Sequence, residues 1–154
     1  MHYIDSVTGT TYPLSRARWR GESGAHVNLA EAPGLARKDI DASINSLWRY
    51  RKALLVDAAV AVTMGEGWTP LVPGEWDGVP VLYKLDFMMP TGSFKDRGMT
   101  VMVSYLKSRG VTSVLEDSSG NAGASLSAYC AAAGMHCRIL VPETASYPKI
   151  AQIA

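Results

Sequence analysis

The stretch VTSVLEDSSGNAGASLSAYCAAAGMHCRILV, residues 111–141, decides the fold class. Residues 114–117 and the apolar, β-branched residues 137–141 are typical of short strands. Between them, residues 122–133 are rich in alanine and stop before Gly134, which is typical of a helix with a glycine at its end. A strand, a helix and a second strand in this order predict parallel strands joined by a right-handed crossover.

The pattern extends toward the N-terminus. Residues 79–85 (VPVLYKL) predict a strand, with Pro80 near its start, where a missing N–H donor does least harm. Residues 94–109 predict a helix that stops at Gly110. Its apolar stripe contains Met99, Met102, Val103 and Leu106. Together these elements predict an α/β fold, a parallel sheet with flanking helices.

Two loops of this predicted sheet are expected to carry its function. Residues 89–93 and 118–121 each connect a strand to a helix. Ligands of open α/β sheets bind beyond the carboxyl ends of the strands, so we expect both loops at the same sheet edge.

The first half of the chain has a different character. Residues 1–30 are rich in turn formers and predict short strands with tight turns. Residues 39–56 predict a helix capped by Asp41 or Ser43. The residues near helical spacing in it are Ile44, Leu47, Trp48, Arg51 and Leu55. Residues 64–70 predict a loop, and residues 73–74 and 77–78 further breaks.

Composition narrows the class of protein. Hydrophobic residues make up 47% and charged residues 19% of the 154, and the net charge is +1. We therefore expect a folded protein with no nucleic-acid or membrane partner. No apolar run reaches the roughly 18–20 residues of a membrane span, and residues 1–10 do not resemble a signal peptide. Cys130 and Cys137 predict two buried thiols in a reducing compartment, and the cytoplasm is the expected location.

The segment PTGSFKDRG, residues 90–98, is the first candidate for chemistry. It places Lys95 within the first turn of a helix, where the helix dipole disfavours a cation. A lysine that is neutral part of the time is the amine that Schiff-base chemistry requires. The alternative is an ordinary surface lysine in a solvated charge cluster with Asp96 and Arg97.

The segment DSSGNAGAS, residues 117–125, is the second candidate. It offers hydroxyls, a glycine, an amide and backbone N–H groups at a predicted helix N-terminus, which suits a carboxylate or another anion. Asn121 could donate to an oxygen on a cofactor ring. The alternative is a helix cap made by Ser118 or Ser119.

These segments carry a resemblance to a known family. Residues 90–98 resemble the lysine motif of threonine synthases, which are fold-type II pyridoxal-phosphate (PLP) enzymes related to the tryptophan synthase β subunit. Residues 118–123 are similar to the asparagine loop of the same superfamily. Residues 65–71 (GEGWTPL) and 47–51 (LWRYR) resemble segments that precede the catalytic core. The resemblance covers nearly the whole chain, and the lysine motif is specific for the superfamily.

The resemblance implies a role for each candidate residue. Lys95 would hold PLP as a Schiff base and then act as the proton-shuttling base, and Phe94 and Asn121 would contact the cofactor. The substrate carboxylate would lie on Ser118, Ser119, Gly120, Asn121 and Ala122. The implied reaction converts O-phospho-L-homoserine and water to L-threonine and phosphate, by a homo-oligomer in the full-length form.

The resemblance also implies a domain organisation. Residues 1–30 would form a degenerate zinc-ribbon-like knuckle, residues 31–78 an N-terminal extension, and residues 79–154 the PLP-attaching lobe. Asp5, Thr8, Gly21 and Ser23 stand where zinc-binding relatives would have cysteines. His2 and His26 cannot replace four thiolates, so we predict no metal.

The C-terminal segment 147–154 predicts the first turns of a helix, without a natural stop. We therefore expect an incomplete lobe and a fragment, because the loop that grips the PLP phosphate in this family would lie further on. Apolar faces left exposed would then cause association or aggregation. Two alternatives stay open: a sibling PLP lyase, such as a serine or threonine dehydratase or a cysteine synthase, and a truncated chain without catalytic activity.

Overall fold

The computed structural model describes residues 2–32, 34–54 and 56–154. The structure contains the unit that the sequence predicts most directly. Strands β6 (Ser113–Asp117) and β7 (His136–Leu140) pair in parallel, with helix α2 (Asn121–Ala133) as the crossover between them. Gly134 ends α2 in the left-handed conformation (φ 68°), as a C-terminal glycine does. The predicted strand–helix–strand unit is confirmed.

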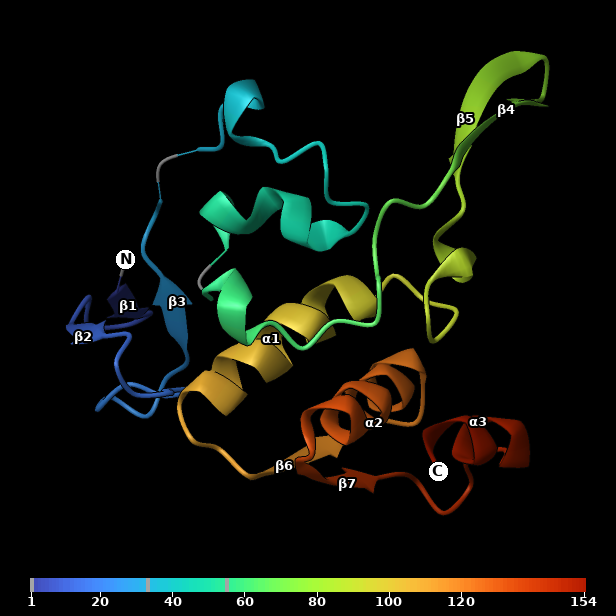
Figure 1. Cartoon of the computed structure of the whole chain (residues 1–154). Helices are drawn as coiled ribbons and strands as arrows, with labels where there is room; N and C mark the ends of the chain where they lie inside the picture. Colours follow the sequence, from blue (N-terminus) through green and yellow to red (C-terminus); the bar gives the residue numbers. More distant parts are fainter. Residues whose placement is uncertain (1, 33, 55) are drawn as a thin grey trace.

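Helix α1 (Asp96–Ser108) packs against α2 above this pair of strands (Figure 1). Val103 is fully buried in the shared core, and Met99 and Leu106 are partly buried against it, whereas Met102 is 39% exposed. The helix is therefore as predicted, with three of the four stripe residues facing the core. The buried members of the core are Val62, Val103, Leu126, Tyr129, Cys130, Ala133 and Met135.

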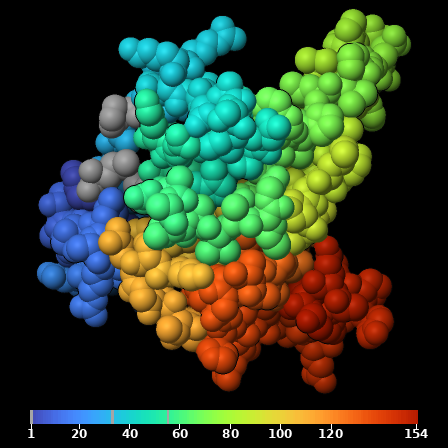
Figure 2. Space-filling model, in the orientation of Figure 1, coloured from blue at the N-terminus to red at the C-terminus, as the bar shows by residue number. Residues whose placement is uncertain are grey.

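The prediction that residues 79–85 join the parallel sheet is wrong. Strand β5 (Val79–Lys84) pairs with β4 (Leu71–Trp76) in an antiparallel hairpin of its own, which projects from the body of the molecule (Figures 1 and 2). The cause is the two-residue turn Asp77–Gly78. Both residues have positive φ (48° and 76°), as the tight turn of a two-residue hairpin requires.

The two candidate loops therefore do not share one sheet edge as expected. Loop 118–121 follows β6, but loop 89–93 follows the short 3-10 helix η4 (Asp86–Met88) after the separate hairpin. Contacts between helices α1 and α2, described below, bring them together instead.

The predicted helix over residues 39–56 is also wrong. The chain forms short 3-10 helices there: η1 (Arg37–Asp39), η2 (Leu47–Ala53) and then η3 (Ala58–Val60). Asp41 does not cap a helix, because its carboxylate accepts from Ser43 N and Oγ in a local turn. Ser46 caps η2 instead, and the Leu47 N–H donates to Glu66 O at 2.7 Å. Leu55 lies outside the described residues.

Residues 2–29 form the short strands that the sequence predicts, with β1 (His2–Asp5) between β2 (Thr11–Pro13) and β3 (Val27–Leu29). The Asp5 carboxylate, 1% exposed, accepts hydrogen bonds from Ser23 Oγ (2.7 Å) and Thr8 N (3.0 Å). A Cβ on Gly21 would lie 1.7 Å from Asp5 Oδ2. The four positions at which zinc-binding relatives would have cysteines, Asp5, Thr8, Gly21 and Ser23, thus lie together around the Asp5 carboxylate.

Hydrogen bonds from Ser23, Thr8 and Val7 lower the pKa of Asp5 well below its ordinary value. Among the described residues, no group of three or more His, Cys, Asp or Glu side chains is placed to hold a metal. The absence of zinc stays a prediction.

The C-terminal segment forms helix α3 (Tyr147–Ile153), as predicted. Gln152 Nε2 donates to Thr91 O at 3.1 Å, which connects α3 to loop 89–93. Within the described ranges, no helix combines the length and the apolar character that crossing a membrane requires.

Candidate active site

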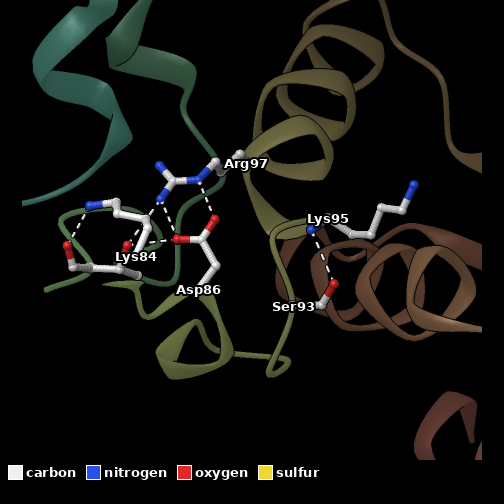
Figure 3. A network of polar contacts seen from close by, with 6 residues as sticks. Lys84, Asp86, Ser93, Lys95 and Arg97 are labelled. Carbon is white, nitrogen blue, oxygen red and sulfur yellow. Dashed lines mark hydrogen bonds and ion pairs between the residues drawn. The ribbon is translucent and has the colours of Figure 1, made fainter. Parts of the chain in front are cut away.

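Lys95 lies directly before α1, with helical backbone angles (φ −58°, ψ −28°). Its N–H donates to Ser93 Oγ at 3.2 Å, and its side chain is partly buried, with the amine 5.0 Å from the centre of the Phe94 ring. In the described part of the chain, the amine has no hydrogen-bond or ion-pair partner (Figure 3). Lys95 therefore offers a free amine.

Its charged neighbours are not its partners, which argues against a solvated charge cluster. Asp96 is fully buried, and Arg97 pairs with Asp86 at 2.8 Å. Figure 3 shows the Lys95 and Arg97 side chains leaving the start of α1 on opposite sides. That follows from helix geometry, since two residues span about 200° around the axis.

The Asp96 carboxylate connects the starts of the two helices. It accepts from Thr91 N (2.8 Å) and Thr91 Oγ1 in loop 89–93, and from Ser125 Oγ (2.5 Å) in α2. Ser125 lies one turn after Asn121, the first residue of α2. One buried carboxylate thus fixes loop 89–93 next to the beginning of α2, where residues 118–122 lie.

The charge of Lys95 also affects the pKa of Glu116. Glu116 is the next-to-last residue of β6, and its Oε2 is buried without a hydrogen-bond partner in the described residues. Burial raises the pKa of Glu116, and the charge of Lys95 partly offsets this. The positive charge of Lys95 thus influences a carboxyl group near the end of β6, two residues before the second candidate loop.

In that loop, the alternative of a helix cap is correct for Ser118. Its Oγ accepts from Gly123 N at 3.0 Å and, more weakly, from Gly120 N at 3.4 Å. Ser119 N, Asn121 N and Ala122 N have no acceptor in the described ranges, and the Asn121 side chain is exposed. Three free N–H donors at a helix N-terminus can bind an anion such as a carboxylate.

Sequence reasoning missed the buried polar residues that hold this arrangement. Asp96, Thr100 and Ser104 recur at every fourth position and are fully buried on one face of α1. Thr100 Oγ1 donates to Val62 O (2.8 Å), and Ser104 Oγ accepts from Val62 N (2.7 Å). The sequence feature that could have indicated these three residues is their four-residue spacing, which places them on one helix face beside the apolar stripe.

Glu66, in the GEGWTPL segment, is a further residue that sequence reasoning missed. It is fully buried and accepts from Trp48 Nε1 (3.0 Å), Thr63 Oγ1 (2.9 Å), Met64 N (2.9 Å) and Tyr129 OH (2.6 Å). Burial and Glu66 raise the pKa of Tyr129 well above its ordinary value, so the phenol stays a donor. Glu66 thereby attaches the segment before the hairpin to α2.

A separate hollow of about 650 Å³ lies on the other side of α1 from the Lys95 amine, and Lys95 does not line it. Arg97 and Asp86 form part of its wall, with Arg97 Nε and Nη2 donating to the two carboxylate oxygens at 3.2 and 2.8 Å. Lys84 donates to the Thr69 carbonyl in the same wall. Of these two lysine amines, Lys84 is engaged and Lys95 has no partner in the described residues, and a nucleophile must be free to react.

Comparison with known proteins bears on this assignment. The family model described as "Pyridoxal-phosphate dependent enzyme" matches residues 62–154, more than half of the chain, including Lys95 and the 118–122 loop. The chain belongs to the pyridoxal-phosphate-dependent enzyme family. The residues present fit that cofactor, since a free amine and unpaired N–H donors lie at the joined starts of α1 and α2.

Curated members of the family are similar to this chain at the sequence level. A threonine synthase of Mycobacterium leprae (strain TN) is 44% identical over 99 residues, which are 61% of this chain and 28% of that protein. A threonine synthase of Halalkalibacterium halodurans is 40% identical over 109 residues (64% and 30%). One of Methanosarcina acetivorans is 44% identical over 102 residues (63% and 25%). The chain thus spans between a quarter and a third of the length of these relatives.

Proposed function

We propose that this chain is the cofactor-attaching part of a fold-type II PLP-dependent threonine synthase, with Lys95 as the attachment residue. The observation that carries the proposal is the free Lys95 amine at the start of α1, which the Asp96 carboxylate joins to the beginning of α2, beside residues 118–122, through Thr91 and Ser125. The threonine synthases with 40–44% identity support the choice of reaction. Because the chain spans under a third of their length, the complete reaction is proposed for the whole enzyme.

Each residue has a role in this proposal. Lys95 Nζ would hold the cofactor and, when free, would move protons to and from the substrate carbons. Asn121 would donate a hydrogen bond to the cofactor, and Phe94, whose ring centre is 5.0 Å from the Lys95 amine, would lie beside it. When bound, PLP supplies the electron sink for loss of phosphate from O-phospho-L-homoserine and addition of water at the β carbon.

The substrate carboxylate is assigned to the turn from Ser118 to Ala122. The free N–H groups of Ser119, Asn121 and Ala122 point to backbone donors as its main partners. Ser118 contributes indirectly, because its Oγ is engaged in holding Gly123 N and the turn itself. Gly120 adopts an extended conformation (φ −144°, ψ −155°), which sets the direction of the turn.

The proposal extends to the setting of the enzyme. We place it in the cytoplasm as a homo-oligomer, in keeping with the free thiols of Cys130 and Cys137. Residues 1–30 would be a knuckle in which Asp5 replaces the metal, residues 31–78 an extension that Glu66 attaches to α2, and residues 79–154 the attaching lobe.

Trapping of the cofactor tests the attachment residue. The chain is mixed with PLP at a substoichiometric ratio, reduced with borohydride, digested and analysed by mass spectrometry. We expect the pyridoxyl group on Lys95. Lys107, near the end of the same helix, is the internal control for unspecific labelling, and Lys95→Ala should remove the main adduct while the far-UV spectrum is unchanged. Equal labelling of both lysines would refute the assignment.

Product analysis separates threonine synthase from a sibling lyase. The whole enzyme should release phosphate from O-phospho-L-homoserine and form threonine. A serine or threonine dehydratase would release ammonia from serine or threonine instead. Ammonia without phosphate would reject the proposed reaction but leave the attachment residue in place.

A further inference from the structure

The hollow opposite Lys95 has the composition of a binding site that the proposed reaction does not use. Its volume of about 650 Å³ lies in the range of small-molecule pockets. Three of the side chains that line it are cationic: Arg49, Lys84 and Arg97. Of the described residues in its wall, Asp86 is the single acid. The wall therefore carries a net positive charge of about two, and an anion is the ligand it attracts.

The charges in this wall are unequally paired. Asp86 is fully engaged by Arg97, and Lys84 has a neutral carbonyl, Thr69 O, as its partner. Arg49 has no acidic partner in the part of the chain that the structure describes, and its Nε is buried without an acceptor. An arginine in this state presents a fork of donors suited to a phosphate.

An aromatic residue holds Arg49 in place. The guanidinium carbon lies 4.0 Å from the centre of the Trp68 ring. Trp68 is 54% exposed and has a positive φ of 52°, a backbone conformation that residues with a Cβ rarely adopt. Such outliers occur preferentially at ligand sites, where the surrounding structure maintains them. The ring also gives the pocket an apolar surface beside its cations.

We propose that this basic pocket binds a small phosphate anion, through Arg49 and Lys84, with Trp68 beside the ligand. The site is distinct from the Lys95 site, because Arg97 in its wall and Lys95 leave α1 on opposite sides (Figure 3). The phosphate is either free or part of an aromatic phosphate whose ring stacks on Trp68.

Calorimetric titration of the 154-residue chain with inorganic phosphate, at constant ionic strength, tests the proposal. We expect saturable binding with a Kd of about 1 mM or tighter. Arg49→Gln should weaken it about tenfold or more, the effect of losing a charge-assisted hydrogen bond, and Arg49→Lys should weaken it less. Titration with phenyl phosphate distinguishes the two sources. If the ligand is an aromatic phosphate, phenyl phosphate should bind more tightly than inorganic phosphate, and Trp68→Leu should raise its Kd to that of inorganic phosphate. If the ligand is free phosphate, the two Kd values should be equal.

Two variants serve as controls. Arg51→Gln removes the same charge two residues away, where Arg51 pairs with Asp41 outside the pocket, and should leave the Kd within about twofold. Lys95→Ala should bind phosphate as the unchanged chain does. The proposal is overturned by absence of saturable binding, by equal losses in Arg49→Gln and Arg51→Gln, or by loss in Lys95→Ala alone.

Discussion

Replacing Glu66 with glutamine exchanges one carboxylate oxygen for an NH₂ group at a fully buried polar side chain. The carboxylate is fully buried and receives four hydrogen bonds, from Trp48, Thr63, Met64 and Tyr129. An amide keeps one acceptor oxygen and puts an NH₂ group in place of the other. Two of the four donors then face a donor in a site that water does not reach.

The expected loss of stability follows from these contacts. A hydrogen bond to a charged group contributes about 1.5–3 kcal/mol, and two are removed. Rotation of the Tyr129 hydroxyl, which can also accept, recovers part of this. We therefore expect the free energy of unfolding to fall by about 2–4 kcal/mol, a large share of the 5–15 kcal/mol of an ordinary domain.

Urea unfolding followed by far-UV circular dichroism measures this difference. With a slope of about 2 kcal/mol per molar urea, the midpoint should fall by about 1–2 M. Glu75→Gln is the matched control, because Glu75 is exposed on β4 and makes no side-chain hydrogen bond in the described residues. It should change the free energy of unfolding by less than about 0.5 kcal/mol.

A double-mutant cycle with Tyr129→Phe tests whether the two residues act through their 2.6 Å hydrogen bond. Once Glu66 is replaced, the phenol should contribute less, so the two losses should be less than additive. Strict additivity, or a Glu66→Gln variant as stable as Glu75→Gln, would refute the view that this carboxylate holds the N-terminal segment to α2.

Three further predictions concern other parts of the chain. Gly67→Ala should destabilise by about 2 kcal/mol or more, because Gly67 has φ +99° and a Cβ would lie 2.6 Å from a backbone nitrogen of η2. Gly65→Ala, with φ +84° and open space, should lose less by the same urea assay. The pKa of Asp5 is lowered by its hydrogen bonds, so its stabilisation is complete above the ordinary carboxyl pKa of about 4 and is lost as the pH falls below it. In Asp5→Asn, the fall of stability below about pH 4 should therefore be less steep, and the slope between pH 7 and pH 4 should be unchanged. Burial, and then the neighbouring Cys137, raise the pKa of Cys130 to about 12, so iodoacetamide at pH 8 should modify Cys137 first, as mass spectrometry would show.

The elements that the sequence predicts correctly are those whose signal is local. Helices α1 and α2 carry apolar or alanine-rich patterns and end at Gly110 and Gly134, both with positive φ. Strands β6 and β7 are joined by one crossover, and the handedness and pairing of such units are general properties of the chain.

The failures arise where distant contacts or turn chemistry override the pattern. Residues 39–56 have helical spacing, but hydrogen bonds from Leu47 N to Glu66 O and from Trp48 to Thr100 fix the chain in another path. The dipeptide Asp77–Gly78 favours two-residue turns and therefore indicates the β4–β5 hairpin, but from the sequence this dipeptide was interpreted only as a break.

The candidate site divides in the same way. Lys95 and residues 118–122 could be proposed from the sequence because the residue types that indicate their chemistry are consecutive; their roles stay predictions. The partners of Asp96 lie 5 and 29 residues away, and those of Glu66 up to 63 residues away, so no local pattern contains them. Cys130 is buried as predicted, whereas Cys137 is only partly so.

Three consecutive charged residues show how the fold separates what the sequence places together. At the start of α1, successive side chains point about 100° apart, so neighbours cannot share one environment. Asp96 turns inward and is satisfied by Thr91 and Ser125, and Arg97 turns to Asp86. Lys95 is thereby deprived of both nearby charges as partners, which leaves its amine free. The buried Asp96 carboxylate joins the two helices, and for the same reason it is not a counterion of the adjacent Lys95. Moving Asp96 out of its pocket would therefore separate the two loops and also offer Lys95 an ion pair.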